Sequence, residues 1–479
     1  SAASDVYKRQ ELTMADGFMG AGMKDTVAYF DLFFRRVPDN GGFAIAAGLS
    51  KVIDYLEHLH FREEDIKYLK SKGISDELAS YLKDFKFTCD VWAIPEGTPI
   101  FPNEPIIKVR GPIIEAQLIE TMLLLSINQQ SLIATKANRL VRAAHGTAVA
   151  EFGTRRAQGV DEAVYGARAA YIGGCVATSG VIPEKEFGIP SVNTMIHSWV
   201  QLFDSEYDAF CEYARRHPDD CTLVVDTYDT IRSGIPNAIK AFDDVLAPLG
   251  KRPKSVRIDS GDITYLSKRV RKMLDVAGYP DCDIMASNSL DEHLISDMVS
   301  QGAKVDCFIV GERLITSASS PLFGGVYKLA AAKDKDDAEF TPKIKLSENS
   351  EKVTNPGNKT IYRIYDKETG KIKADLICLV GEVFDESKDM KLFDPNAPWK
   401  KTTLPGGSYT LRELLVPVFQ KGECVYESPS VMDIQRYCTR EKDTIWDETK
   451  RFVNPQEIYV DLSDKLYEMK TALLNKEHM

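Results

Sequence analysis

The chain has 479 residues, of which 44% are hydrophobic and 27% charged, and its formal net charge is -11. These values are typical of a folded protein with two or three domains and exclude an intrinsically disordered chain. The acidic balance excludes the basic surface of a nucleic-acid-binding protein, and no apolar run is long enough to span a membrane.

The cysteines and the opening of the chain bear on the cellular compartment. All nine cysteines are scattered singly, without a Cys-x-x-Cys pair, which argues against a zinc site and against a disulfide framework. No signal-peptide pattern opens the chain. We therefore expect a cytoplasmic protein with reduced thiols. The first ten residues do not resemble the ordinary domain sequence that begins near Glu11.

Residues 1–125 mix helical and strand patterns and are expected to form the first part of an α/β domain. Ser75-Asp76-Glu77 can cap a helix. Val91–Arg110 alternates apolar residues with proline and glycine turns, which indicates a small β layer. A long helical stretch then begins at Gly111-Pro112, with proline in a first-turn position, and ends near Gly146.

Residues 126–340 carry a repeated strand-and-helix pattern. Four short apolar runs end at polar or glycine residues that lie 33, 29 and 23 residues apart, namely Asp226, Asp259, Asn288 and Gly311. This spacing is typical of βα units, because a crossover helix with its loops needs at least about a dozen residues. Segments 147–151 and 191–194 extend the series. We therefore predict an irregular (β/α)8-like barrel as the catalytic domain.

Residues 341–479 return to strand patterns after a charged linker at 333–339. Ile361–Tyr365 and Ile372–Val380 flank a turn and are predicted to form a hairpin. We expect this region to pair with the N-terminal β layer, so that both ends of the chain form one α/β domain beside the barrel.

Polar residues at the predicted strand ends are the first candidates for chemistry, because the carboxyl ends of barrel strands surround the active site. Arg155 and Arg156 suit a carboxylate or a phosphate, since a guanidinium donates two parallel hydrogen bonds. Asp226 and Asp259 are expected to face the same pocket. A solvated surface position is the alternative for the two arginines.

Two further segments favour binding of a sugar phosphate. Asp259–Asp262 places acids beside a flexible turn, which suits ribose hydroxyls and Mg²⁺, with Asp262 as the metal ligand; the same segment could begin a capped helix. Gly311, Gly324 and Gly325 fall late in the barrel, where backbone amides commonly bind phosphate. Simple turns would also explain these glycines.

His197 follows a predicted strand end and opens a predicted helix. A helix N-terminus favours negative charge, so an imidazole there could accept a phosphoryl group as a nucleophile. A packing or surface role is the alternative, because most histidines have one.

Eight segments spread along the chain carry a family pattern. They include Glu151-Phe-Gly-Thr-Arg-Arg-Ala-Gln-Gly159, Thr194-Met-Ile-His-Ser-Trp199 and Arg257-Ile-Asp-Ser-Gly-Asp262. The other five are at 30–36, 48–49, 226–230, 286–288 and 324–328. Together, and in this order, they resemble the nicotinate phosphoribosyltransferase family, and the resemblance runs from about Glu11 to about residue 420.

The resemblance implies a fold and a reaction. The fold is the type II phosphoribosyltransferase fold, an irregular α/β barrel with an α/β domain built from both ends of the chain. The reaction joins nicotinate to the phosphoribosyl group of phosphoribosyl pyrophosphate in NAD biosynthesis, while ATP is hydrolysed through a phosphohistidine at the position of His197. The family also implies a homodimer with sites completed across the interface.

The resemblance also implies a set of site residues. His197, Asp226 and Asp259 take the catalytic positions. Mg²⁺ would offset charge on the leaving pyrophosphate, and the acids would favour the positive charge that develops at ribose. The implied substrate-binding residues are Phe152, Gly153, Thr154, Arg155, Arg156, Thr178, Ser179, Arg257, Ser260, Gly261, Asn288, Gly311, Gly324 and Gly325.

Three positions depart from the family pattern. Gln10 stands where the family usually has a tyrosine that stacks on nicotinate, which puts that contact in doubt. Asn193 and Gly180 replace a common glycine and a common asparagine, as expected of subfamily variation. The alternatives are a nicotinamide or quinolinate phosphoribosyltransferase and a non-catalytic phosphate-binding relative. A sugar-phosphate lyase or isomerase is disfavoured, because no lysine stands at the clear strand ends.

Overall fold

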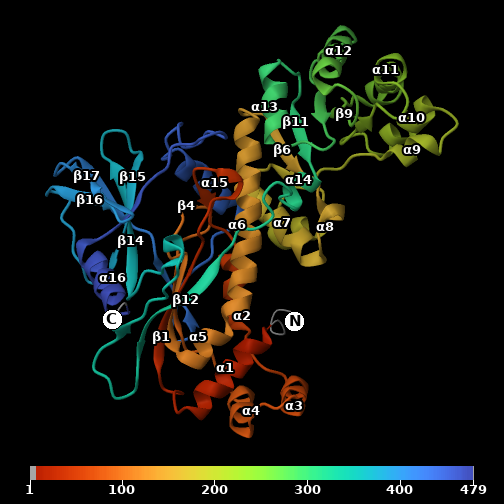
Figure 1. The fold of residues 1–479 in the computed structure, drawn as a ribbon. Helices are drawn as coiled ribbons and strands as arrows, with labels where there is room; N and C mark the ends of the chain where they lie inside the picture. The colour runs from red at the N-terminus through yellow and green to blue at the C-terminus, as the bar shows by residue number, and fades with distance from the viewer. Residues whose placement is uncertain (1–6, 478–479) are drawn as a thin grey trace. The chain divides into compact units, whose positions relative to one another are not determined.

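The structure is a computed structural model that describes residues 7–477 and divides into two compact units (Figure 1). Unit 1 combines the chain up to Leu132 with Leu322–Pro429 and the residues from Arg436 onward. Unit 2 combines Ile133–Pro321 with Ser430–Gln435. Both ends of the chain therefore contribute to one unit. Residues 126–132 and 322–340, which the sequence patterns assign to the barrel, fall in unit 1.

Unit 1 is built on a seven-stranded antiparallel sheet with strands from both ends of the chain, in the order β13-β12-β1-β5-β3-β19-β20. The N-terminal β layer predicted from proline and glycine turns is confirmed as β3 and β5. Val416 of the C-terminal strand β19 pairs with Ala93 of β3. The strands are β1 (Val27–Phe33), β3 (Asp90–Ala93), β5 (Ile107–Pro112), β12 (Val326–Lys333), β13 (Thr341–Pro342), β19 (Val416–Gln420) and β20 (Glu423–Cys424), with a separate pair β2 (Ala44–Ile45) and β4 (Pro99–Ile100).

The predicted C-terminal hairpin is observed as β14 and β15, but it does not join the N-terminal layer. It belongs to a separate four-stranded sheet in the order β18-β14-β15-β21, and β19 makes the connection to the N-terminal layer instead. The reason is that the apolar face of β14 and β15 packs on another hairpin, β16–β17, and so has a core of its own. These strands are β14 (Lys359–Asp366), β15 (Ile372–Leu379), β16 (Met390–Asp394), β17 (Ala397–Leu404), β18 (Tyr409–Glu413) and β21 (Val460–Leu462).

One helix of unit 1 begins at a capping group that the sequence offers. The predicted cap at Ser75 is confirmed, because its hydroxyl accepts the amide hydrogen of Leu78 at 3.1 Å. The predicted stretch from 111 to 146 forms one short and one long helix, and the long one, α6, continues into unit 2. The helices are α1 (Arg9–Gly20), α2 (Leu49–Glu57), α3 (Glu63–Ser71), α4 (Asp76–Lys83), α5 (Ile113–Leu118), α6 (Glu120–Ala143), α15 (Val431–Lys442) and α16 (Asp464–Glu477).

Unit 2 contains a six-stranded, fully parallel sheet in the order β7-β6-β11-β10-β9-β8. It forms a curled half-barrel, so the predicted barrel-like α/β class is confirmed with six described strands in place of eight. Segment 191–194, which the sequence patterns added to the strand series, forms no strand and supplies only one bridge, from Ser191 to Thr178 of β7. The strands are β6 (Ala148–Glu151), β7 (Ala177–Thr178), β8 (Thr222–Val224), β9 (Ser255–Ile258), β10 (Asp283–Ala286) and β11 (Cys307–Val310).

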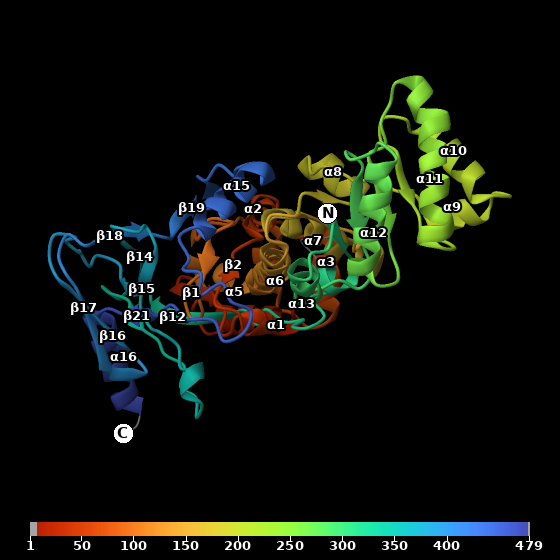
Figure 2. The ribbon, with the colours of Figure 1, turned by 90° about the horizontal axis from the view of Figure 1, so that it is seen from above.

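Helices connect the parallel strands of unit 2, as a βα arrangement requires. In Figures 1 and 2, α10 and α11 lie side by side, in agreement with their packing contacts. No helix in the described part of the chain is long and apolar enough to cross a membrane. The helices are α7 (Val160–Ile172), α8 (Val181–Phe187), α9 (His197–Gln201), α10 (Glu206–Arg216), α11 (Ile235–Ala241), α12 (Ile263–Val276), α13 (Glu292–Ser300) and α14 (Glu312–Ile315).

Candidate active site

The loops that follow the six parallel strands of unit 2 lie along one edge of the sheet, because parallel strands end on the same side. Each of these loops carries residues that the sequence singled out. The predicted residues in these loops are Phe152 after β6, Asp226 after β8, Asp259 after β9 and Gly311 after β11. Strand β7 ends at the predicted residue Thr178.

His197 lies at the centre of the polar contacts on this edge. Its Nδ1 atom is 2.9 Å from the hydroxyl of Thr227. Its Nε2 atom is 3.4 Å from Oδ2 of Asp259 and 4.0 Å from Oδ1 of Asp226. The side chain is 40% exposed, so a ligand can reach it. The helix that it opens has only five residues, which is too short for the predicted stabilisation by a helix dipole, so the structure offers His197 only these side-chain contacts.

Asp226 anchors the loop after β9. Its Oδ2 atom accepts the backbone amide of Asp259 at 2.9 Å and the hydroxyl of Ser260 at 2.6 Å. The side chain is 3% exposed, and its Oδ1 atom has no hydrogen-bond partner within residues 7–477. A buried carboxylate oxygen without a partner is costly, and this one is turned toward His197.

Asp259 is held from two sides. Its Oδ1 atom accepts hydrogen bonds from the Ser287 hydroxyl and from a terminal nitrogen of Arg257, the latter at 3.3 Å. Arg257 also donates through Nε to Ser287 at 2.9 Å. Burial alone would raise the pKa of Asp259, but the Ser287 hydrogen bond, the charge of Arg257 and the contact with His197 together leave that pKa below its ordinary value. Asp259 is therefore a charged carboxylate at neutral pH.

A second group of contacts joins the ends of β6 and β7. The carboxylate of Glu151 accepts the amide of Gly153 at 2.8 Å and the hydroxyl of Thr178 at 3.1 Å. The hydroxyls of Thr154 and Ser179 lie 3.0 Å apart. These bonds shape the two loops together, and burial raises the pKa of Glu151.

One contact links the two groups. The guanidinium of Arg257 lies over the ring of Phe152, 6.0 Å from its centroid. This distance is at the outer limit of a cation–π contact. The structure thus brings Phe152, Gly153, Thr154, Thr178 and Ser179 to the same edge as the group around His197.

Gly153 is required by a close approach between loops. A Cβ atom at this position would lie 2.4 Å from Cβ of Ile315 and 3.0 Å from the carbonyl oxygen of Gly311. Gly311 itself would place a Cβ atom 3.3 Å from the carbonyl oxygen of Phe152. The two predicted glycines therefore let the loops after β6 and β11 touch, which is a packing role.

The exposed members of the predicted set have fewer contacts. Arg155 and Arg156 lie on a 3-10 turn after Thr154, are exposed, and form no ion pair within residues 7–477. Asn288 is exposed with φ of 94°. Open guanidinium groups beside the site are available to an anionic ligand.

Asp262 and the late glycines have structural roles in addition to their predicted ones. The carboxylate of Asp262 caps α12 by accepting the amide of Tyr265 at 2.9 Å. Just before it, Gly261 has φ of 81°, which favours glycine. Gly324 and Gly325 belong to unit 1, and the amide of Gly325 donates to Asn128 at 2.9 Å. Phosphate binding by these glycines stays a prediction.

Thr227, Ser287 and Glu151 are site residues that sequence reasoning did not single out for a role. Each stands directly beside a predicted residue, namely Asp226, Asn288 and Phe152. Proximity to a strand end was the available signal. It did not show that these side chains, rather than their neighbours, turn toward the site.

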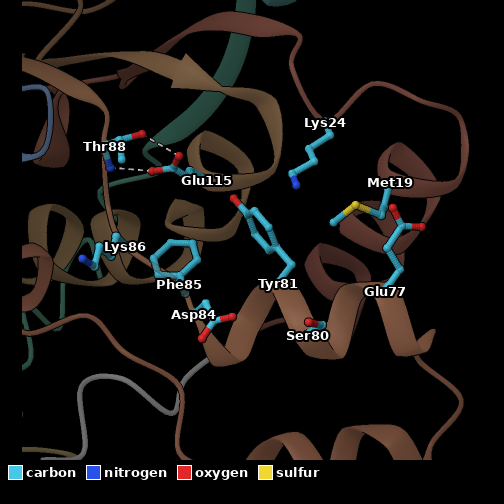
Figure 3. Close-up of a pocket in the computed structure, with 10 residues that line it drawn as sticks. All are labelled: Met19, Lys24, Glu77, Ser80, Tyr81, Asp84, Phe85, Lys86, Thr88 and Glu115. Carbon is cyan, nitrogen blue, oxygen red and sulfur yellow. Dashed lines mark hydrogen bonds between the residues drawn. The ribbon is translucent and has the colours of Figure 1, made fainter.

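The cavity in Figure 3 lies apart from the predicted residues. Its volume is about 650 Å³, and it is in unit 1. Figure 3 shows Tyr81 and Lys24 facing it, with Glu115 held by Thr88 through hydrogen bonds of 2.6 and 2.7 Å. No predicted site residue lines it. The described residues also contain no group of three or more His, Cys, Asp or Glu side chains that could hold a metal.

Comparisons with protein families cover both ends of the chain. The profile described as the nicotinate phosphoribosyltransferase (NAPRTase) N-terminal domain matches residues 3–128. The profile described as the nicotinate phosphoribosyltransferase C-terminal domain matches residues 358–470.

Comparisons with individual proteins cover nearly the full length. A nicotinate phosphoribosyltransferase of Bacillus subtilis (strain 168) is 42% identical over 480 residues, 99% of this chain and 95% of its own length. The crystal structure of human nicotinic acid phosphoribosyltransferase has a TM-score of 0.86 at 27% identity and covers 98% of this chain and 100% of that chain. A nicotinate-nucleotide pyrophosphorylase of Pyrococcus furiosus shares the fold, with a TM-score of 0.69 at 23% identity, over 92% of this chain and 96% of that chain.

Proposed function

Since this chain belongs to the nicotinate phosphoribosyltransferase family, we propose that it is the enzyme that joins nicotinate to the phosphoribosyl group of phosphoribosyl pyrophosphate in NAD biosynthesis, with ATP as co-substrate. The products are nicotinate mononucleotide and pyrophosphate, together with ADP and phosphate. The observation that carries the proposal is the group at the strand ends of unit 2, where His197 lies within 4.0 Å of both Asp226 and Asp259.

The transfer step suits two carboxylates and no strong base. The pyridine nitrogen of nicotinate attacks the anomeric carbon, and pyrophosphate leaves with the electron pair of the broken C–O bond. The nitrogen has no proton to lose, so no general base is needed. The ribose is positively charged in the transition state, and the carboxylates of Asp226 and Asp259 would stabilise that charge. Arg155 and Arg156 are the candidates to bind anionic groups of the substrates.

His197 is the proposed acceptor of the ATP γ-phosphoryl group. A ring nitrogen attacks phosphorus, the N–P bond forms, and ADP leaves with the electron pair of the broken P–O bond. Phosphorylation adds about two negative charges. Nε2 faces two carboxylates, whereas Nδ1 faces a neutral hydroxyl. We therefore assign the phosphoryl group to Nδ1, on the side away from the carboxylates.

The residues present fit Mg²⁺ as cofactor. Mg²⁺ prefers oxygen ligands and usually takes one or two carboxylates together with substrate phosphates and water. Oδ1 of Asp226 is buried and has no hydrogen-bond partner among the described residues, and it is the carboxylate oxygen we assign to the metal. The other predicted ligand, Asp262, stands three residues after Asp259, and its carboxylate caps α12. When bound, Mg²⁺ would neutralise charge on the pyrophosphate leaving group.

A homodimer in the cytoplasm is the proposed form of the enzyme. Val160, Val181 and Ile182, at the starts of α7 and α8, are exposed apolar side chains that follow the loops of the site. A second copy of the chain would cover them. All nine cysteines are free thiols, as a reducing compartment favours. Sedimentation of the purified protein tests the dimer, and a monomer at assay concentration would contradict it.

Product formation tests the proposed reaction. Purified protein is incubated with phosphoribosyl pyrophosphate, Mg²⁺ and nicotinate, with and without ATP, and nicotinate mononucleotide is measured. We expect product, and more of it with ATP. Conversion of nicotinamide or quinolinate without conversion of nicotinate would overturn the assignment, and no product with any of the three would support a non-catalytic relative.

Labelling tests the role of His197. With ATP labelled at the γ-phosphate, we expect acid-labile, base-stable label on the intact protein. His197→Ala should abolish the label, whereas His58→Ala, a change of an exposed histidine in unit 1, should leave it unchanged. Label that persists in His197→Ala would contradict the assignment.

A further inference from the structure

We propose that Glu151 is a positioning residue, whose buried carboxyl group holds the turn that carries Arg155 and Arg156 against the end of β7. The two arginines are thereby fixed where they can bind the anionic groups of the substrates. The inference rests on the proposed function, and it gives a role to a side chain that has no part in the proposed transfer and phosphorylation steps.

The carboxyl group of Glu151 is enclosed by the protein. Glu151 is the last residue of β6, its exposed fraction is 0%, and it forms no ion pair within residues 7–477. Burying a carboxyl group without a cation is costly unless hydrogen bonds satisfy it. Burial also raises its pKa, and groups of this kind beside a substrate site are candidates for a functional role. The hydrogen bonds of Glu151 indicate what that role is.

The two carboxyl oxygens of Glu151 face two different loops. Oε2 accepts the backbone amide of Gly153 at 2.8 Å, and Oε1 accepts the hydroxyl of Thr178 at 3.1 Å. The Thr178 oxygen in turn accepts the amide of Gly180 at 3.1 Å. The carboxyl group therefore bridges the loop after β6 and the loop after β7 from their buried side.

The first of these bonds holds the turn that carries the arginines. Gly153 directly precedes the 3-10 turn Thr154–Arg156, and its carbonyl oxygen accepts the amide of Arg156 at 2.8 Å. The backbone of Gly153 is thus fixed at its amide by Glu151 and at its carbonyl by the turn. The side chains of Arg155 and Arg156 are exposed and form no ion pair in the described part of the chain. Their position therefore depends on the backbone of this turn.

The second bond strengthens the link between the two loops. The amide of Ser179 donates to the carbonyl oxygen of Glu151 at 2.9 Å, so the backbone and the side chain of Glu151 both hold the end of β7. On the exposed side, the hydroxyls of Thr154 and Ser179 lie 3.0 Å apart. Without the carboxyl group, this exposed pair would be the one hydrogen bond between the turn and the end of β7 among the described residues.

The role of Glu151 requires hydrogen bonds and not a charge. An ionised carboxylate accepts from both donors, whereas a neutral carboxyl group accepts from Gly153 and donates to the free lone pair of the Thr178 oxygen. Glutamine can make the same two bonds, with its carbonyl oxygen toward Gly153 and its amide nitrogen toward Thr178. Methionine has a similar length and can make neither bond.

Steady-state kinetics of two Glu151 variants test the inference. A displaced turn weakens binding of the substrates, so Glu151→Met should raise KM for nicotinate, for phosphoribosyl pyrophosphate or for both by about tenfold, while kcat changes by less than about threefold. Glu151→Gln should recover most of this loss. Wild-type KM values for both substrates in Glu151→Met, or an equal rise in KM in the two variants, would overturn the inference.

Removal of the arginines tests whether Glu151 acts through them. The double variant Arg155→Met with Arg156→Met should raise the same KM. Addition of Glu151→Met should then raise it no further, because the effects of residues that act through a shared contact are not additive. A triple variant in which the two effects multiply would contradict a positioning role.

A bond between a carboxylate and an amide at the opposite end of the sheet is the matched control. Asp306 directly precedes β11, and its carboxylate accepts the amide of Ile284 at 2.8 Å. Asp306→Ala removes this bond at the amino ends of the strands, so it should lower thermal stability and leave both KM values unchanged. A rise in KM in this variant would show that lost stability alone changes KM, and would contradict the inference.

The proposed function and the inference about Glu151 fail in different ways. If the wild type makes no nicotinate mononucleotide, the proposed function fails, while calorimetric binding of nicotinate and of inorganic pyrophosphate to the same variants still tests Glu151. If the wild type binds neither, both fail. If the wild type is active but Glu151→Met has the same KM values, only the inference about Glu151 fails. Thermal unfolding verifies that each variant is folded, and Thr178→Val, which removes the hydroxyl that donates to Glu151, replaces Glu151→Met if that variant does not fold.

Discussion

Two charged clusters in this protein use similar residues and differ in access to solvent. In unit 1, Arg363 donates to both carboxylate oxygens of Asp375 at 2.9 Å and lies 3.9 Å from Glu104, and all three side chains are 0% exposed. In unit 2, Arg257 and Asp259 form an open pair beside the partly exposed His197. The sealed cluster can only hold strands together, whereas the open one can receive a ligand.

The comparison shows that residue type alone does not separate a structural ion pair from a site. Burial, first, and then Asp375 raise the pKa of Glu104 well above its ordinary value, so that carboxyl group is kept neutral inside unit 1. The pKa of Asp259 is lowered instead, since hydrogen bonds and Arg257 outweigh its burial. A charged, reachable carboxylate is useful for catalysis, and a sealed neutral one is not.

The largest expected effect comes from breaking the sealed pair. Asp375→Leu leaves the Arg363 charge buried without its main partner and should lower the free energy of unfolding by about 3–5 kcal/mol, measured by urea denaturation. The double variant Arg363→Met with Asp375→Leu should recover most of this loss, because no buried charge remains. A loss below about 1 kcal/mol in the single variant would show that the pair is not sealed in solution.

Removing one charge from the open cluster should act on catalysis instead. Asp226→Asn should lower kcat/KM for nicotinate by about 10²–10³-fold, the usual effect of losing one electrostatic contact to a transition state. The unfolding free energy should change little. Asp219→Asn, at an exposed carboxylate, is the control. Activity within threefold of the wild type would place Asp226 outside the reaction.

Adding a side chain at Gly153, where the loops after β6 and β11 touch, should affect both stability and activity. In Gly153→Ala the new methyl group would meet Ile315 at 2.4 Å, so we expect a loss of about 1–3 kcal/mol in unfolding free energy and lower activity. Gly17→Ala, which meets nothing within 4 Å, should be neutral or slightly stabilising. If Gly153→Ala unfolds like the wild type, the loops after β6 and β11 do not touch as described.

A pH-dependent effect is expected at Asp461, a buried carboxyl group of unit 1 that forms no ion pair among the described residues. Burial, with Asp394 nearby, raises the pKa of Asp461 to about 7. Because this folded-state pKa lies above the unfolded value of about 3.9, the protonated form is favoured on folding, and stability falls as pH rises from about 4 to about 7. Asp461→Asn should therefore be more stable than the wild type at pH 8, whereas the two should be equally stable at pH 4. Equal gains at both pH values in thermal unfolding would contradict this pKa.

Much of the parallel sheet could be predicted from the sequence, because each strand of this kind is a short apolar run that ends at a polar residue. β8, β9, β10 and β11 follow that rule and were predicted. β7 has two residues and no such run, so it was not. The packing partner of the C-terminal hairpin could not be predicted from local patterns either, because its apolar face packs on β16–β17, a separate segment further along the chain.

Part of the candidate site could also be predicted, because two of its carboxylates stand at strand ends. Asp226 and Asp259 stand at strand ends, so their position on one edge follows from the sheet. Thr227 and Ser287 stand one residue away from predicted positions, and their roles depend on contacts with residues 30 positions distant. A local pattern cannot say which of two adjacent side chains turns toward such a partner.

The sequence by itself determined the parallel α/β class, the joining of both chain ends in one domain and the acids at the strand ends, because near neighbours in the chain set hydrophobic patterning and turns. The tertiary structure alone decided which charges are sealed and which are open, and which nitrogen of His197 faces a hydroxyl. These depend on strand register and loop conformation across tens of residues, and a register shift of one position would turn each strand side chain to the other face of the sheet.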